Sequence, residues 1–356
     1  MLPAKISPHF FFADVLRALA VFAVIILHIA SDYVEHYGEI SNSDWWAANI
    51  YNGLVRFCVP MFVMLSGALL LKPGKIVTAK EIFYKRLPRI LIPLVFWSIV
   101  YVLFDNYLKH KTLAEIDVKQ QIKVFYQGPV VFHLWYLYML IGIYLLYPII
   151  NVFISAAEEI QVRYFLIIWF IANSVIGMVN IIFNLDTGID LNFFTGYIGY
   201  FVIGYYLIHF TFTPEQLRKA YLLGILGFII SVLTPYLCVL LNFLNRSALV
   251  ESDFTPDIIL SVAGLFLFMK NRLHANQKSI IINKGVSEIS KESFGIYLIH
   301  ILVMKIVFSN DRSYAEKLQN LHTVWLIPFE AIIILIFSFT VIKLIRLVPY
   351  LKKVAG

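Results

Sequence analysis

The chain has 356 residues, of which 60% are hydrophobic and only 14% are charged. Soluble globular domains are about half apolar and a quarter charged, so this composition excludes an ordinary soluble protein and indicates that lipid is the solvent. The net charge of +7 comes from basic residues that lie mostly between apolar runs, which favours membrane topology over nucleic-acid binding.

A helix needs about 20 residues to cross a bilayer, and ten apolar runs reach or approach this length. They lie at residues 10–31, 50–71, 87–104, 131–154, 164–184, 193–210, 219–241, 256–270, 292–309 and 324–345. The first run is long for a signal peptide and is predicted to be a retained helix. Solid apolar runs, without alternation, exclude a lipid-exposed barrel of strands. The sequence therefore predicts an all-α integral membrane protein with about ten transmembrane helices in a single domain, and no large soluble domain before or after it.

The distribution of charge predicts the orientation. With a cytoplasmic N-terminus, most Lys and Arg residues fall in cytoplasmic loops. The outer loop at residues 31–49 carries four acidic residues and no Lys or Arg. By the positive-inside rule, both termini are expected to be cytoplasmic.

The first run contains Arg17 and His28 at membrane depth, where a charge at the helix centre costs about 2.5–3.5 kcal/mol. Their spacing places them about 20° apart on one helix face and about 16 Å apart along the axis. The structural alternatives are that Arg17 reaches the interface with help from Asp14, and that His28 bonds a neighbouring helix. Asp32, one turn beyond His28, is placed to orient its imidazole.

The second run contains Arg56 and the pair Ser66-Gly67. Ser-Gly inside a helix is typical of close helix packing. Arg56, near the predicted outer end, is harder to explain, although it could pair with an outer-side carboxylate.

The third run begins with Arg86 and Arg89, three residues apart. Guanidinium groups and the free backbone N–H groups of a helix start both suit phosphate, although topology alone also explains basic residues here. The fourth run starts with His133 and Trp135, and Trp135 is equally typical of an aromatic belt at the interface.

The late runs add Tyr297 and His300, at i and i+3 near mid-membrane, and Glu330. A buried carboxylate is costly unless paired, and the candidate partners of Glu330 are His28, Arg56, His133 and His300. The two cysteines lie in apolar runs and the nine histidines show no paired metal spacing, so neither a disulfide framework nor a metal site is expected.

Five sequence blocks, taken together and in order, resemble the membrane acyltransferase type 3 family. They are DVLRALAVFAVIILH, RFCVPMFVMLSG, KRLPR, FHLWYLYMLIGIYLLYPII and SFGIYLIH. The chain is similar to the short members, which lack an appended soluble esterase-like domain and include polysaccharide O-acetyl- and O-succinyltransferases. The resemblance implies an O-acyltransferase of the bacterial cytoplasmic (inner) membrane. It would move an acyl group, usually from acetyl-CoA, to a hydroxyl of a surface polysaccharide or an undecaprenyl-type lipid-linked glycan.

The resemblance also implies roles for individual residues. His28 matches the proposed catalytic histidine, and Arg17, Arg86 and Arg89 match positions that handle the acyl donor. The supporting role of Asp32 rests on helix spacing alone. Residues expected to support the substrate or the transition state are Arg56, His133, Trp135, Tyr297, His300 and Glu330.

The expected partners are acyl-CoA as co-substrate, the glycan acceptor and membrane lipid, with no metal and no nucleic acid, and a homo-oligomer is compatible with the sequence. The main alternative is a multi-pass transporter or exporter of a glycan or small polar substrate, because intramembrane charges also mark substrate pathways. The lack of an inverted repeat and the few helices broken by Gly or Pro count against it. A scaffold or sensor would leave Arg17, His28 and Glu330 without a purpose.

Overall fold

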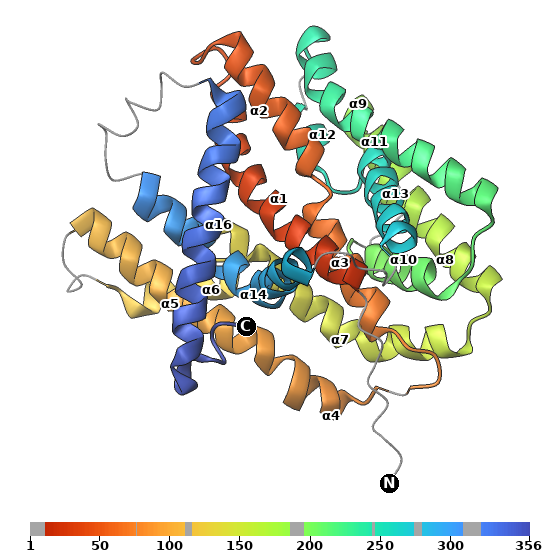
Figure 1. Cartoon of the computed structure of the whole chain (residues 1–356), viewed down its shortest axis with the longest axis horizontal. Helices are drawn as coiled ribbons and strands as arrows, with labels where there is room; N and C mark the ends of the chain where they lie inside the picture. The colour runs from red at the N-terminus through yellow and green to blue at the C-terminus, as the bar shows by residue number, and fades with distance from the viewer. Residues whose placement is uncertain are drawn as a thin grey trace. The chain divides into compact units, whose positions relative to one another are not determined.

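The computed structural model describes residues 11–75, 77–110, 116–185, 196–243, 246–273, 280–308 and 322–356. Every regular element in these residues is helical (Figure 1). Within them, eight helical stretches are long and apolar enough to cross a membrane. They are Phe11–Glu35, Asn42–Leu70, Ala79–Leu108, Phe132–Ala156, Glu159–Phe183, Pro214–Leu240, Leu249–Arg272 and Thr323–Leu347. The predicted class, an all-α integral membrane protein, is confirmed.

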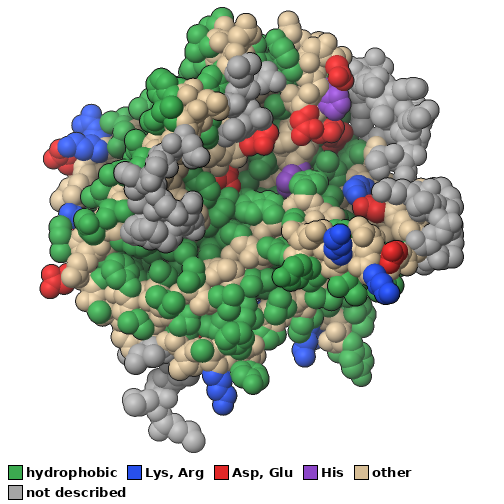
Figure 2. Space-filling view, turned by 180° about the vertical axis from the view of Figure 1, so that it is seen from behind, with side chains coloured by type: hydrophobic (Ala, Val, Ile, Leu, Met, Phe, Trp, Pro, Cys, Tyr) green, Lys and Arg blue, Asp and Glu red, His purple; other side chains and the backbone are tan. Residues whose placement is uncertain are grey.

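The helices expose large apolar side chains, as lipid-facing helices do. In α11 (Pro214–Leu240), Leu222, Ile225 and Ile229 keep about half of their surface exposed. Hydrophobic side chains cover broad areas of the face drawn in Figure 2. A soluble monomer rarely exposes apolar patches of this extent, so the exposed faces fit a lipid environment.

Two of the ten predicted runs are not among the eight stretches. The run 193–210 corresponds to α10 (Ile198–His209), which has 12 residues, and its first three residues lie outside the described part. The run 292–309 forms the second part of α14 (Ile280–Phe308), a 29-residue helix. The number of ten crossings stays a prediction.

The described helices group into two compact units. The first unit is Met1–Leu70 with Glu159–Ser293, and the second is Leu71–Glu158 with Phe294–Gly356. The first unit contains α1 (Phe11–Glu35), α2 (Asn42–Val55), α3 (Cys58–Leu70), α8 (Glu159–Phe170), η3 (Ile171–Ile176), α9 (Gly177–Phe183), α10, α11, α12 (Arg246–Glu251), α13 (Pro256–Arg272) and the start of α14. The second contains α4 (Ala79–Glu81), η1 (Ile82–Arg86), α5 (Pro88–His110), α6 (Val118–Gln127), η2 (Phe132–Leu134), α7 (Trp135–Ala156), the rest of α14, α16 (Thr323–Leu347) and η5 (Pro349–Leu351).

Glycines allow close helix contacts in the first unit. A side chain at Gly67 of α3 would meet the carbonyl of Phe201 in α10, and one at Gly204 of α10 would meet the carbonyl of Met64. The close packing predicted for Ser66-Gly67 is therefore confirmed. α11 and α13 lie side by side in the same way, since a Cβ on Gly224 would come within 2.9 Å of the Cα of Gly264 (Figure 1).

The second span is broken in its middle, between α2 and α3. Proline explains the break, because Pro60 has no N–H for the carbonyl four residues earlier, which belongs to Arg56, and its ring clashes with that carbonyl. The span also starts earlier than the predicted run 50–71, since the Ser41 side chain caps α2 by accepting a hydrogen bond from the Asp44 N–H. Arg56 is consequently the central residue of the 29-residue helical stretch Asn42–Leu70, and its depth in the membrane stays a prediction.

The third span also begins before its predicted start at residue 87. Thr78 caps the helix by accepting a hydrogen bond from the Glu81 N–H at 3.2 Å, and the helix continues through the π-helical η1 into α5. Pro88 has no backbone N–H to donate. The residue before it, Leu87, donates its N–H to the Ile82 carbonyl at 2.9 Å, which is the bond of a π-helix. Arg86 is the last residue of η1 and Arg89 is the second residue of α5, and their role toward phosphate stays a prediction.

Candidate active site

The helix α1 carries Arg17 and His28, as predicted. Arg17 is partly exposed, and its guanidinium lies 3.5 Å from the carboxylate of Asp14, which confirms the expected help from Asp14. Asp14 is buried and accepts hydrogen bonds from Ser287 at 3.0 Å and Ser290 at 2.8 Å. Arg17 therefore has a fixed counter-ion, as the structural alternative requires, and its role toward the donor stays a prediction.

His28 is partly buried in α1, within a candidate membrane span. Asp32 is exposed in the last turn of the same helix. Its backbone carbonyl accepts a hydrogen bond from Nδ1 of His36 at 2.6 Å, and this bond raises the pKa of His36 above its ordinary value. The orienting role of the Asp32 carboxylate toward His28 stays a prediction.

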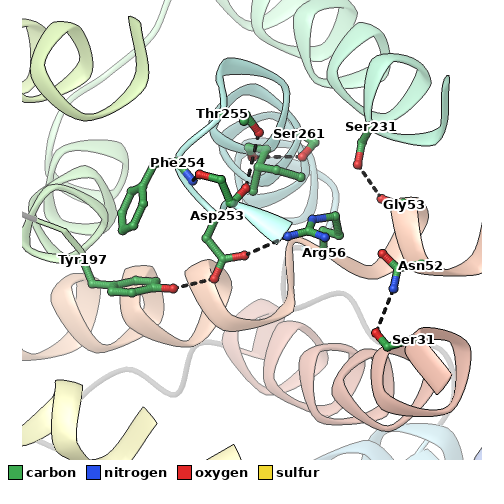
Figure 3. A network of polar contacts seen from close by, with 12 residues as sticks. Ser31, Asn52, Gly53, Arg56, Tyr197, Ser231, Asp253, Phe254, Thr255 and Ser261 are labelled. Atoms are coloured by element: carbon green, nitrogen blue, oxygen red, sulfur yellow. Dashed lines mark hydrogen bonds and ion pairs between the residues drawn. The ribbon is translucent and has the colours of Figure 1, made fainter. Parts of the chain in front are cut away.

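Arg56 meets the carboxylate that its burial requires. Its guanidinium lies 3.8 Å from Oδ1 of Asp253, whose Oδ2 accepts a hydrogen bond from the Tyr197 hydroxyl at 2.5 Å (Figure 3). Tyr200 donates a hydrogen bond to the backbone carbonyl of Asp253. Arg56 is only 8% exposed, and removing one partner of such a buried ion pair costs about 3–5 kcal/mol. The network therefore holds the Arg56 side chain in one place.

A cavity of about 80 Å³, with both polar and apolar lining residues, lies against Arg56 within the first unit. Its lining residues are Asn52, Arg56, Met178, Ile230, Ser231, Thr234, Pro235, Leu249, Val250, Thr255 and Asp257. Asn52 connects the cavity to α1, because its amide donates a hydrogen bond to the Ser31 hydroxyl at 3.0 Å (Figure 3). Ser31 lies three residues after His28, on the same side of α1.

In the second unit, His133, Tyr297 and His300 form one buried cluster. Both histidines are fully buried, and their rings lie 5.3 Å apart. Tyr297 donates a hydrogen bond to the His133 carbonyl, and Nδ1 of His300 donates to the Tyr297 carbonyl at 2.6 Å. The predicted residues of the fourth and ninth runs are thus brought together.

The Tyr101 hydroxyl forms hydrogen bonds with the backbone of α14 beside this cluster. It donates a hydrogen bond to the Leu298 carbonyl at 3.0 Å and accepts one from the Leu302 N–H at 3.1 Å. These are the two groups that bond each other in an undisturbed α-helix, so the Tyr101 hydroxyl ties α5 to the backbone of α14 around His300.

The two predicted donor residues, Arg86 and Arg89, differ in their surroundings. Arg86 is held by Glu81, at 3.2 Å, and its guanidinium lies 6.0 Å from the centre of the Tyr147 ring. Arg89 is exposed. One guanidinium is therefore held by a partner, and the other lies on the exposed surface.

Glu330 is buried in α16, and Trp135 is partly buried at the start of α7. Both belong to the second unit, together with Arg86, Arg89 and the histidine cluster. His28, Asp32, Arg17 and Arg56 belong to the first unit.

A family model described as an acyltransferase domain, that of acyltransferase family 3, matches residues 10–345. The chain belongs to this acyltransferase family. The match runs through both compact units and nearly the whole chain. No curated protein and no solved structure was found to match the chain.

The sequence interpretation of this membrane acyltransferase missed Asn52, Tyr197, Asp253 and Asp257. The two aspartates stand in the segment DFTPD, just before and at the start of the predicted run 256–270. The sequence offered one signal for these partners: acidic residues stand beside an apolar run, and Arg56 lacks an explanation. Hydropathy gave no means to choose these two among the other acidic residues of the chain.

The chemistry that the acyltransferase needs is compatible with its side chains. The described residues include no group of three or more His, Cys, Asp and Glu placed to hold a metal ion. Acyl transfer needs a proton acceptor for the attacking hydroxyl and a donor for the oxyanion. The described residues include side chains of both kinds, and their roles in the reaction stay predictions.

Proposed function

We propose that this acyltransferase transfers an acyl group, in the first place acetyl, from cytoplasmic acyl-CoA to a hydroxyl of a cell-surface polysaccharide or its lipid-linked precursor. The likeness of its blocks to those of the enterobacterial common antigen O-acetyltransferase supports the acetyl group and the glycan, and polysaccharide O-succinyltransferases are the nearest alternative. The enzyme would act in the bacterial inner membrane.

The observation that carries the proposal is His28, a partly buried imidazole inside a membrane span of an acyltransferase. Imidazole is the side chain that exchanges protons near neutral pH, so a histidine retained at membrane depth suits proton transfer. His28 would take the proton of the acceptor hydroxyl while the hydroxyl oxygen attacks the thioester carbonyl. The CoA thiolate would then leave and be protonated. In the alternative mechanism, His28 carries the acyl group for a short time as an acyl-histidine, and the overall reaction is the same.

The donor would enter from the cytoplasm. Under the positive-inside rule the basic segment around Arg86 and Arg89 is cytoplasmic, which is where CoA and its phosphates are found. Guanidinium groups bind phosphate with directed, charge-assisted hydrogen bonds. Trp135 would offer a stacking face to the sugar, and Arg56, Tyr297 or His300 would donate to the oxyanion.

Mass spectrometry of surface glycans tests the proposal. Cells lacking the gene should lose one kind of acyl ester, and the wild-type gene should restore it. His28→Ala should leave the protein inserted but reduce acyl transfer about 10²- to 10⁴-fold, which is the usual contribution of a general base. His36→Ala, just beyond the same helix, is the matched control and should keep full activity. Acylation near the wild-type level with His28→Ala would remove this histidine from the chemistry.

A further inference from the structure

The cavity beside Arg56 combines hydrogen-bond donors, acceptors and apolar walls. Arg56 and Asp257 are each at least nine-tenths buried. The Nε–H of Arg56 is fully buried and has no hydrogen-bond partner among the described residues. Asn52, Ser231, Thr234 and Thr255 add amide and hydroxyl groups, and the remaining lining is aliphatic apart from Met178. The Arg56 guanidinium carries five N–H donors, so ligand oxygens that accept from those facing the cavity would be favoured.

The charges of the cavity select the class of ligand. Asp253 pairs with Arg56, and Asp257 adds a second carboxylate to the lining. The lining itself carries one guanidinium and one carboxylate, so a ligand of either net charge would be repelled by one of the two. Neutral hydroxyl groups accept from Arg56 and donate to Asp257 at the same time. Carbon–hydrogen faces of a sugar ring would lie against Ile230, Leu249 and Val250.

The size of the cavity limits the ligand to part of a sugar. A cavity of about 80 Å³ has room for several oxygen-sized groups but not for a whole glycan. One hydroxyl-bearing edge of a ring has this size. The rest of the glycan would extend out of the cavity.

The position of the cavity relates it to the catalytic histidine. Asn52 lines the cavity and bonds Ser31, one turn from His28 on α1. Arg56 lies at the break between α2 and α3, and the cavity adjoins it. Both features lie in the first unit.

We infer that this cavity is a binding site for the vicinal hydroxyl groups of a neutral sugar. The inference rests on the proposed function, and identifies the site as the place where part of the acceptor glycan is held. Arg56 donates to one hydroxyl oxygen, and Asp257 accepts from a neighbouring hydroxyl.

Titration of the purified full chain in lipid nanodiscs tests the site with three probes of the same ring: methyl β-D-glucopyranoside, D-glucosamine and D-glucuronate. Ligand-observed NMR gives the dissociation constants. The neutral glycoside should bind more tightly than the cationic and anionic sugars. Asp257→Asn should weaken binding of the glycoside by about tenfold, since it removes one charge-assisted hydrogen bond. No binding of the glycoside, or tighter binding of either charged sugar, would overturn the inference.

A second variant fills the cavity without removing a polar group. Val250→Phe should weaken binding of the glycoside at least as much as Asp257→Asn does. Leu226→Phe, on the exposed face of α11, should leave this affinity unchanged. Binding of CoA to each variant reports that it is folded. If Val250→Phe binds CoA and the glycoside as the wild type does, the cavity is not the sugar site. Failure of the wild-type protein to bind CoA or to acylate any glycan would instead contradict the proposed function.

Discussion

Two arginines in membrane spans are supported in different ways. Arg17 keeps part of its surface exposed and lies beside Asp14, so its charge needs little help from the protein. Arg56 is 8% exposed at mid-span and depends on Asp253 and Tyr197. Because a buried charge needs a partner, Arg56 depends on this network in a way that Arg17 does not. This contrast favours a binding role for Arg56.

Arg86 and Arg89 are predicted to act on the donor. The double variant Arg86→Ala with Arg89→Ala should raise the KM for acyl-CoA by about tenfold or more, with a smaller change in kcat, because charge-assisted hydrogen bonds to phosphate are lost. Lys at both positions should restore the KM only in part, since ammonium groups lack the planar fork. Steady-state kinetics with varied acyl-CoA measure both constants.

Lys80→Ala is the control for this pair. Lys80 is exposed in the first turn of the same helix and carries the same charge. If Lys80→Ala raises the KM as much as the double variant, the basic segment acts only through its net charge. An unchanged KM in the double variant would reduce Arg86 and Arg89 to a signal for topology.

At the scale of elements, hydropathy predicted where helices lie better than where they begin and break. The run 324–345 agrees closely with α16 (Thr323–Leu347), because nearly all of its residues are apolar. The span Asn42–Leu70 begins in the polar segment NSDWW, which hydropathy does not recognise as helix. The break in the same span follows from Pro60, but many helices carry an internal proline without breaking, as α7 does at Pro148. The outcome depends on the packing around each proline.

The packing of α3 against α10 is expected to depend on Gly67. Gly67→Ala would place a methyl group against the Phe201 carbonyl, so the backbones must separate at a cost of about 1–3 kcal/mol or more. Thermal unfolding of the purified protein should show a lower Tm. Gly142→Ala in α7 is the matched control, because no atom lies within 4 Å of the added Cβ, and its Tm should be unchanged or slightly higher. Equal losses in both variants would show that the effect is not one of helix contact.

At the scale of the whole molecule, the family and the membrane class followed from order and composition along the sequence. The blocks predicted an acyltransferase, and the match over residues 10–345 confirms it. Contacts between distant segments did not follow. Arg56 with Asp253, and Tyr101 with Leu298, join helices far apart in the chain, and a single sequence contains no record of such pairs. The residues of the candidate site were therefore partly predictable one by one, while their partners were not.

The number of crossings is open because two helices differ from a standard span. α10 is about 18 Å long, whereas the hydrocarbon core is about 30 Å thick. α14 is long enough but begins with a charged segment that includes Lys284, Glu288 and Lys291. If both helices cross, the chain crosses ten times and both termini are cytoplasmic. If only one crosses, the termini lie on opposite sides.

Two introduced cysteines decide between these outcomes. One lies directly after α10, and the other lies near the C-terminus, after α14 and α16. In a variant with Cys58→Ala and Cys238→Ala, Thr211→Cys reports on α10 and Lys352→Cys reports on the C-terminal side, since both positions are exposed. Ten crossings predict that a membrane-impermeant maleimide labels neither cysteine in intact cells and both after permeabilisation, while Ser43→Cys, exposed in the first turn of α2 at its predicted outer end, is labelled in intact cells. Labelling of Thr211→Cys in intact cells would show that α10 does not cross. Labelling of Lys352→Cys alone would show that α14 does not cross, and the prediction that both termini are cytoplasmic would be wrong.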